Sequence, residues 1–336
     1  MLRVPDYYEK FHCLAGDCPH SCCIGWEVVL DEETVERYRS VSGPLGEKLR
    51  DAMARDEEGD VYFPLNGGRC PFLDGENLCE IHKCLGEEAT SVTCQSHPRF
   101  IEEYGQVREI TLAASCPAAN SLLLGSRAPL TFPVVEADGE PDEDSRPFFA
   151  LRERALALLG DRTRPLGSRL RALLVLAGEA QAALDEGEDE ALYALAEADP
   201  AGEPEVTGEG LFPAALEVLE ELEILGEDWL PLLAAGKSAP GLDLEEYAPA
   251  LERICAYFLF RYFCKAVNDG DLLSRVQLAL FGTLTAARLG SLCGLEEALR
   301  RFSREVEHSE ENLEQLQEAF CFDGRLSPER FFMSLK

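Results

Sequence analysis

Cysteines are the residues of this 336-residue chain whose type and spacing best suit chemistry. A thiolate is a soft ligand that suits zinc and iron–sulfur clusters. Disulfides are rare in a reducing compartment, so a dense group of cysteines there indicates metal or cluster ligands. Nine of the thirteen lie in the first 120 residues: Cys13, Cys18, Cys22, Cys23, Cys70, Cys79, Cys84, Cys94 and Cys116.

The first four of these cysteines follow the pattern Cys13-x4-Cys18-x3-Cys22-Cys23. Structural zinc takes four ligands, and a [4Fe–4S] cluster takes up to four. Eight or nine thiols therefore suffice for two sites, or for one site with neighbouring or redox thiols. The spacing lacks the regular pairs of zinc fingers. It also departs from a Cys-x3-Cys-x2-Cys signature, because the third position is Gly25.

Histidines occur in the same region and offer mixed ligation as an alternative. Each could bind a metal through a ring nitrogen or serve as a hydrogen-bonding neighbour. These residues are His12, His20, His82 and His97. Cys84 has no glycine turn beside it, so it is left outside the expected ligand set.

The composition changes along the chain and predicts a mainly α protein. Residues 1–125 are expected to form a small, irregular, cysteine-rich metal- or Fe–S-binding domain with few short strands. Residues 126–147 are acidic, contain prolines and read as a linker. Residues 148–336 show apolar spacings of three and four and are expected to form an all-α domain. The helical windows are 150–159, 168–184, 212–225, 242–267, 271–289, 295–306 and 310–320.

Two shorter signals refine the helical part. Segment 254–263 is apolar almost all round, which predicts a helix at the centre of the core. Ser327-Pro328 has the residue types of an N-cap followed by a first helical residue, which predicts a last short helix.

Charge and hydropathy restrict the partners. Sixty-three acids against 31 bases give a net charge of -32, which opposes nucleic-acid binding. The same charge would attract a lysine-bearing partner, and the alternative interpretation is that it serves solubility alone. No apolar stretch approaches the ~18–20 residues of a membrane span. The first eleven residues carry no secretory signal, so we expect a cytoplasmic protein without a membrane partner.

An ordered set of motifs carries a resemblance to a known family. The set comprises Phe11-x-Cys13 with Cys18, Cys22-Cys23-x2-Trp26, Cys70-Pro71-Phe72-Leu73, Leu78-Cys79-x-Ile81, Leu85-Gly86-Glu87, Cys94-x3-Pro98-Arg99 and Ser115-Cys116-Pro117, with a tail from Glu305 to Gly324. In order and spacing the chain resembles the flagellin lysine N-methylases (FliB-like), which carry a zinc- or iron-chelating domain of the CxxCxxCC type.

The resemblance implies a protein-lysine N-methyltransferase. Its substrate would be flagellin, its methyl donor S-adenosylmethionine, and its metal group a [4Fe–4S] cluster, with zinc as the alternative. The ligand candidates carried over from the family are Cys13, Cys18, Cys22, Cys23, Cys70, Cys79, Cys94 and Cys116. Two other interpretations stay open: a non-catalytic zinc- or iron-binding interaction module, and a redox or metal-handling protein.

The residues themselves leave the donor site and the catalytic residues unassigned. No strand–glycine-rich loop–helix unit of the Rossmann type is present, so the donor would be held in another way, for example at an open iron position. The lysine amine also has to lose a proton, since its ordinary pKa is ~10.4. Glu102, Glu103 and Tyr104 are candidates for this step, with an ordinary surface role as the alternative.

Overall fold

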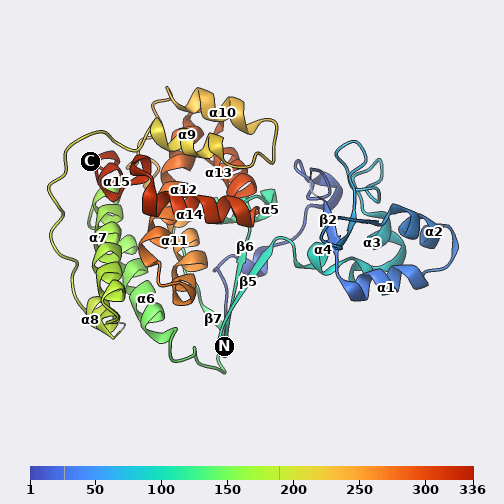
Figure 1. Ribbon diagram of the computed structural model, residues 1–336, viewed down its shortest axis with the longest axis horizontal. Helices are drawn as coiled ribbons and strands as arrows, with labels where there is room; N and C mark the ends of the chain where they lie inside the picture. Colours follow the sequence, from blue (N-terminus) through green and yellow to red (C-terminus); the bar gives the residue numbers. More distant parts are fainter. Residues whose placement is uncertain (26, 189) are drawn as a thin grey trace. The chain divides into compact units, whose positions relative to one another are not determined.

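The computed structural model describes residues 1–25, 27–188 and 190–336. Fifteen α-helices dominate the described residues, so the predicted mainly α class is confirmed (Figure 1). The chain forms two compact units. The helical unit comprises Met1–Lys10, Ile101–Ser115 and Asn120–Lys336, and the cysteine unit comprises Phe11–Phe100 and Cys116–Ala119.

These units differ from the boundaries expected at residues 125 and 148. A four-stranded sheet explains the difference, because β1 (Leu2–Arg3) lies between β6 (Val107–Leu112) and β7 (Val134–Glu136), with β5 (Arg99–Tyr104) beyond β6. β1 pairs with β6 in parallel and with β7 antiparallel. The first residues and part of the acidic segment 126–147 therefore belong to the helical unit. That segment contains a strand and is more than a linker.

The helices of the helical unit follow the windows that the apolar spacing indicates. The described residues from 148 to 336 contain no strand. The short helices α8 and α10 had no sequence signal. The bounds are α5 (Pro117–Leu124, across the division), α6 (Arg146–Gly160), α7 (Leu166–Asp185), α8 (Ala191–Glu197), α9 (Ala214–Glu221), α10 (Trp229–Gly236), α11 (Ala248–Tyr262), α12 (Leu272–Cys293), α13 (Leu295–Phe302), α14 (Glu310–Phe322) and α15 (Pro328–Ser334).

The core of the helical unit forms around α11. Every residue from 254 to 263 is buried, as the all-round apolar pattern predicts. α11 packs against α12 and α6. The contact with α12 is close at Gly282, where a Cβ would stand 2.7 Å from the ring of Phe258. A larger residue at this position would have to push the two helices apart.

α12 is long and apolar enough to cross a membrane by length and composition, in contrast to the expectation that no apolar stretch approaches this length. Its 18-residue window has a mean hydropathy of 1.3, and 78% of that window is buried inside the fold. A core helix of a folded domain has the same composition as a membrane span. The burial of α12 against α11, α13 and α7 accounts for its apolar character.

The cysteine unit is built on a three-stranded antiparallel sheet in the order β2 (Val28–Leu30), β4 (Val61–Phe63), β3 (Ala54–Arg55). The carboxylate of Asp31 caps α1 by accepting from the Thr34 N–H at 2.9 Å, and it also accepts from the Val92 N–H at 3.0 Å. One side chain thus starts one helix and holds the start of another. The helices are α1 (Glu32–Ser40), α2 (Gly43–Ala52), α3 (Glu80–Leu85) and α4 (Val92–Ser96).

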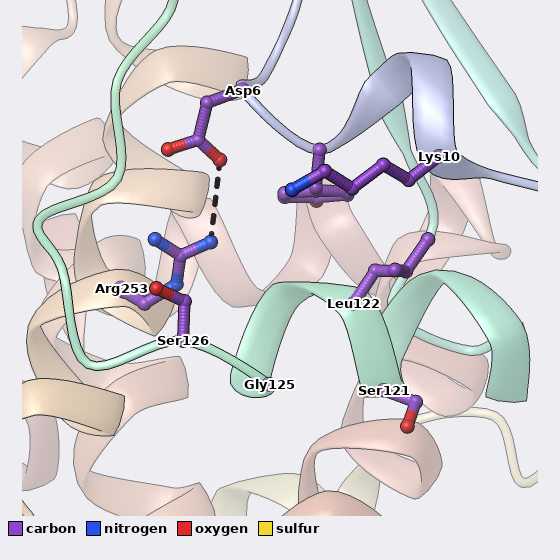
Figure 2. Close-up of a pocket in the computed structure, with 8 residues that line it drawn as sticks. Asp6, Lys10, Ser121, Leu122, Gly125, Ser126 and Arg253 are labelled. Atoms are coloured by element: carbon purple, nitrogen blue, oxygen red, sulfur yellow. Dashed lines mark hydrogen bonds and ion pairs between the residues drawn. The ribbon is translucent and has the colours of Figure 1, made fainter.

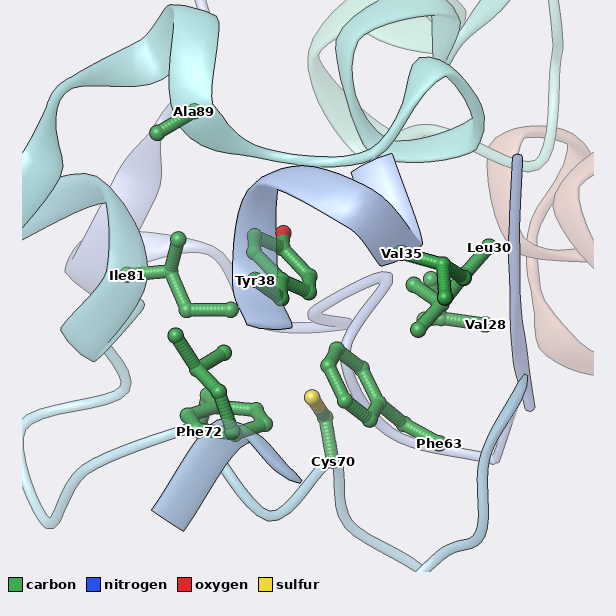
Figure 3. Close-up of a cluster of buried hydrophobic side chains, with 10 residues drawn as sticks. Val28, Leu30, Val35, Tyr38, Phe63, Cys70, Phe72, Ile81 and Ala89 are labelled. Carbon is green, nitrogen blue, oxygen red and sulfur yellow. The ribbon is translucent and has the colours of Figure 1, made fainter. Parts of the chain in front are cut away.

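A small aromatic core fixes the cysteine unit (Figure 3). The ring of Phe63 lies 5.8 Å from that of Tyr38 and 4.7 Å from that of Phe72. The thiol of Cys70 lies among these rings, and Cys23 and Cys79 pack against the same cluster. Three of the cysteines are therefore anchored by apolar packing as well as by their loops.

Candidate metal centre

Backbone hydrogen bonds hold the first and second cysteine loops side by side. The Cys70 N–H donates to the Cys23 carbonyl at 2.8 Å, and the Gly25 N–H donates to the Gly68 carbonyl at 2.8 Å. Gly25 and Gly68 have φ values of +82° and +77°, a region that favours glycine. The turns that bring the two loops together thus depend on glycine. Trp26, the last residue of the Cys22-Cys23-x2-Trp26 motif, lies outside the described residues.

Three other cysteines lie at helix N-termini. Cys79 is the N-cap of α3, Cys94 lies in the first turn of α4, and Cys116 directly precedes α5. The N–H groups of the first turn and the helix dipole stabilise a negative charge there. Each of these short helices places its first-turn N–H groups near a cysteine. The placement suits thiolates, which are the form that binds metal.

Backbone N–H groups lie near several of the expected ligands. Burial raises the pKa values of Cys79 and Cys116, while the N–H groups of Ile81 and His82 lower that of Cys79 and those of Ala118 and Ala119 lower that of Cys116. The Ala15 N–H lies 3.4 Å from the Cys13 sulfur, and the Phe72 N–H donates to Cys70. Since the lone pairs of a thiolate accept hydrogen bonds, these donors favour the charged form of the thiol.

The mutual influence of the thiols sorts them into two groups. Burial raises the pKa values of Cys70, Cys79 and Cys94, and the charge of Cys23 raises each of them further. Burial also raises the pKa of Cys116, with smaller effects from the charges of Cys18 and Cys13. The first group contains Cys22, Cys23, Cys70, Cys79 and Cys94. The second contains Cys13, Cys18 and Cys116. The two groups adjoin, because the charge of Cys13 also raises the pKa of Cys22.

The adjacent thiols Cys22 and Cys23 share a hydrogen bond. It raises the pKa of Cys22, which burial raises further, and it lowers the pKa of Cys23 to about 7. The Ser21 hydroxyl and the charge of Arg69 also lower the pKa of Cys23. The negative charge of the pair is therefore favoured on Cys23.

The chemistry of the donor set fits a thiolate-bound metal, but in this structure the sulfurs of the described residues do not converge on one metal position. All thirteen cysteines are free thiols. Throughout residues 1–25, 27–188 and 190–336, no group of three or more His, Cys, Asp or Glu stands in a metal-holding arrangement. The side chains of Cys13, Cys22 and Cys94 reach solvent, although surrounding atoms partly desolvate the thiols of Cys22 and Cys94 and so raise their pKa values. Rotation about χ1 can therefore move these sulfurs without disturbing the core.

The remaining sequence candidates take different places. His12, His20, His82 and Cys84 are exposed. His97 is half-buried, and burial together with the charge of Arg99 lowers its pKa to about 4. It is thus neutral at physiological pH, the form in which an imidazole binds a metal.

Tyr38 was not indicated by the sequence. Its side chain is fully buried, its hydroxyl has no hydrogen-bond partner among the described residues, and the charges of Cys94 and Cys79 raise its pKa after burial does. Its position on α1 looks like an ordinary core position in the sequence. Only the fold brings its hydroxyl within electrostatic reach of the Cys94 and Cys79 thiols.

The three candidates for taking the lysine proton have structural partners in the helical unit. Glu102 pairs with Lys265 at 2.5 Å, and Glu103 pairs with Arg108 at 2.9 Å. Tyr104 is buried, and its ring packs edge-on at 5.4 Å from that of Phe149. These contacts favour the surface and core roles over catalysis.

Comparison with known proteins places the chain in a family. Residues 12–116 match the CxxCxxCC model, described as "Putative zinc- or iron-chelating domain". The flagellar biosynthetic protein FliU of Salmonella muenchen is 32% identical over 151 residues, which cover 43% of this chain and 86% of that protein. This chain belongs to the FliB-like family. The family predicted from the motifs is confirmed.

Two further FliB-like relatives carry the name lysine-N-methylase. They come from Salmonella typhimurium (strain LT2) and Salmonella choleraesuis (strain SC-B67), and each is 31% identical over 129 residues. The match covers 37% of this chain and only 32% of each methylase, so it spans about a third of their length. No solved structure matches this chain.

Proposed function

We propose that this chain is an S-adenosylmethionine-dependent protein-lysine N-methyltransferase that acts on flagellin and uses a cysteine-ligated [4Fe–4S] cluster. The observation that carries the proposal is the grouping of N–H-supported thiols within the segment that matches a zinc- or iron-chelating domain. The names of the relatives support methyl transfer to lysine and a flagellar substrate.

The first group of thiols is the better candidate for holding the cluster. Cys70 is fixed in the aromatic core, Cys79 accepts two N–H bonds, and Cys23 carries the most stable negative charge. Cys22 and Cys94 complete the group from the surface. Cys13, Cys18 and Cys116 would form a second site or support the first. When bound, a cluster would supply a Lewis acid for the amino and carboxylate groups of the donor.

The transfer itself needs a neutral lysine amine aligned with the methyl group. The amine lone pair forms the N–C bond while the C–S bond of the sulfonium breaks, and S-adenosylhomocysteine leaves with the electron pair. A proton goes from the lysine ammonium to water or a base beforehand. The net charge of -32 attracts lysine-bearing surfaces but also stabilises the ammonium, so the site has to desolvate the lysine.

A cysteine variant and a matched control test the proposal. Protein purified without oxygen is expected to contain iron and sulfide and to methylate flagellin from the same organism. Cys94→Ser removes a thiol of the first group and should lower both metal content and transfer at least tenfold. Cys321→Ser removes an exposed thiol of the helical unit and should change neither. Undiminished transfer by metal-free protein would refute the role of the cluster.

A non-catalytic zinc- or iron-binding module is the second candidate. It is favoured by the name FliU, which states no activity, and by the match to only about a third of each lysine-N-methylase. This interpretation predicts metal-loaded protein that binds flagellin without transferring methyl groups. Zinc would leave the protein colourless, whereas an iron–sulfur cluster gives broad visible absorption. We also propose a cytoplasmic location, where thirteen cysteines stay reduced.

A further inference from the structure

Arg69 lies where the first two cysteine loops of the cysteine unit meet. It ends a tight hairpin turn, in which the Asn66 N–H donates to the Arg69 carbonyl at 2.8 Å and the Arg69 N–H donates to the Asn66 carbonyl at 3.2 Å. The two central residues are glycines with φ values of +58° and +77°, as two-residue hairpin loops favour. Arg69 also pairs with Ile24, the residue after Cys23, and Cys70 follows it directly. The backbone therefore fixes Arg69 beside two cysteines of the first group.

The side chain of Arg69 is held from the loop that leads to Cys79, a third member of that group. The residue is half-buried, and its Nη2 donates to the Asn77 side-chain oxygen at 2.8 Å and, at a longer 3.4 Å, to the Asp74 carbonyl. Asn77 has a φ of +57°, which is uncommon for a residue other than glycine. The Asp74 carboxylate fixes the loop by accepting from two N–H groups within it, each at 2.9 Å. A well-defined loop thus directs two neutral oxygen atoms at the guanidinium.

Among the residues that the structure describes, no carboxylate lies within ion-pair distance of Arg69. Both of its side-chain acceptors are neutral. Lys83, on the neighbouring helix α3, is instead paired with the Asp74 carboxylate at 2.7 Å. Arg253 of the helical unit is held by carbonyls too, but Asp6 completes its contacts (Figure 2). Arg69 therefore keeps its positive charge uncompensated in a chain whose acids outnumber its bases two to one.

This charge acts on the thiols. The hydrogen bond from Cys22 is the main influence that lowers the pKa of Cys23, and the charge of Arg69 lowers it as well. A metal group held by four thiolates keeps a net negative charge, whether it contains zinc or a [4Fe–4S] cluster. A guanidinium stays protonated at every physiological pH, so its charge is permanent. In a partly buried place, a cation stabilises a neighbouring anionic group more strongly than it would in water.

We propose that Arg69 is the counter-charge of the metal centre in the cysteine unit. It is not a ligand and acts on the metal through its charge. Metal binding converts neutral thiols to thiolates, and reduction of a cluster adds a further negative charge, so an adjacent cation favours both. Arg69 thus increases metal retention and raises the reduction potential. This inference rests on the proposed metal centre and is independent of methyl transfer.

Three variants of the full chain separate the charge of Arg69 from its structural contacts. Arg69→Gln removes the charge and keeps an amide N–H for Asn77, whereas Arg69→Lys keeps the charge. Arg55→Gln is the control, because Arg55 is exposed and donates to the Gly59 carbonyl. Each protein is purified without oxygen, and its metal retention is measured by competition with a chelator. Arg69→Gln should weaken retention at least tenfold, while Arg69→Lys and Arg55→Gln stay close to the parent.

The reduction potential supplies a readout that a purely structural role would not move. In the iron-loaded protein, Arg69→Gln should lower the potential by about 59 mV, which is a tenfold change for a one-electron couple. Thermal unfolding of each variant without metal reports on folding. Equal metal retention by the parent and Arg69→Gln would overturn the proposal, as would equal losses in Arg69→Gln and Arg69→Lys. A parent that retains no metal would overturn the metal centre itself.

Discussion

At the scale of single residues, the sequence shows which side chains can bind metal but not what supports them. The cysteines were predicted from their type and spacing. The N–H groups that Ile81 and Ala118 direct at sulfur, and the hydroxyl of Tyr38, depend on the backbone path and on packing between distant segments. Neither leaves a pattern in the sequence, so these parts of the candidate site could not be predicted.

Asp31 gives a prediction with a defined pH dependence. Burial would raise its pKa, but hydrogen bonds from Thr34 and Val92 outweigh this and hold the pKa at about 2. Because the folded pKa lies below the ordinary value, the stabilisation is present above pH ~4 and is lost as the pH falls toward 2. Asp31→Ala should destabilise the protein by ~1–2 kcal/mol at pH 7.

Urea unfolding of this variant and the parent at several pH values checks the prediction. The difference between the two should shrink steadily below pH ~4. Glu33→Ala, on the same helix and exposed, is the control and should show little effect. A difference that stayed constant down to pH 2 would contradict the role of the Asp31 charge.

Tyr38→Phe separates the metal-free protein from the metal-bound one. Without metal, removing an unpartnered buried hydroxyl should leave stability unchanged or raise it by up to ~1 kcal/mol. With metal, the hydroxyl dipole would stabilise the bound thiolates of Cys94 and Cys79, whose charges reach it, so the variant should be the less stable protein. Unfolding with and without metal measures both values. The same difference in stability between parent and variant with and without metal would show that the Tyr38 hydroxyl does not interact with the metal site.

At the scale of elements, helix length decides what the sequence reveals. α7, α11 and α12 span enough turns for the three-to-four spacing to repeat, and Ser327-Pro328 marks the start of α15 as predicted. α8 and α10 have seven and eight residues, and β1 has two, so no period can emerge. The pairing of β1 with β6 joins residues more than a hundred positions apart. It places the first residues of the chain in the helical unit, which the sequence pattern does not indicate.

A buried ion pair between α6 and β6 supports this non-local arrangement. Arg152 meets both oxygens of Glu109, at 2.5 and 2.6 Å, and their side chains are 0% and 3% exposed. Arg152→Ala would leave buried Glu109 with only its long contact to Arg3, at 3.6 Å, and should cost ~3–5 kcal/mol. Arg154→Ala, on the same helix, breaks a pair with exposed Asp199 and a hydrogen bond to the Ala198 carbonyl, and should cost less than ~1 kcal/mol. Equal losses in chemical unfolding would refute this distinction.

At the scale of the whole molecule, the net charge of -32 is a property of the sequence that bears on the partner. Attraction between an acidic protein and lysine-bearing flagellin accelerates encounter and is screened by salt. We therefore expect the association rate to fall at least tenfold between about 20 and 300 mM NaCl, with a smaller change in dissociation. Stopped-flow or surface-based kinetics would measure both rates. A rate independent of salt would mean that the acids serve solubility alone.

The most direct test of the central claim is mass spectrometry of flagellin after incubation with S-adenosylmethionine and anaerobically purified, metal-loaded protein. The account predicts that flagellin gains mass in steps of one methyl group on lysine side chains, and that protein carrying Cys94→Ser produces little gain. Flagellin that stays unmodified beside fully loaded protein, or that is methylated equally well by metal-free protein, would contradict it.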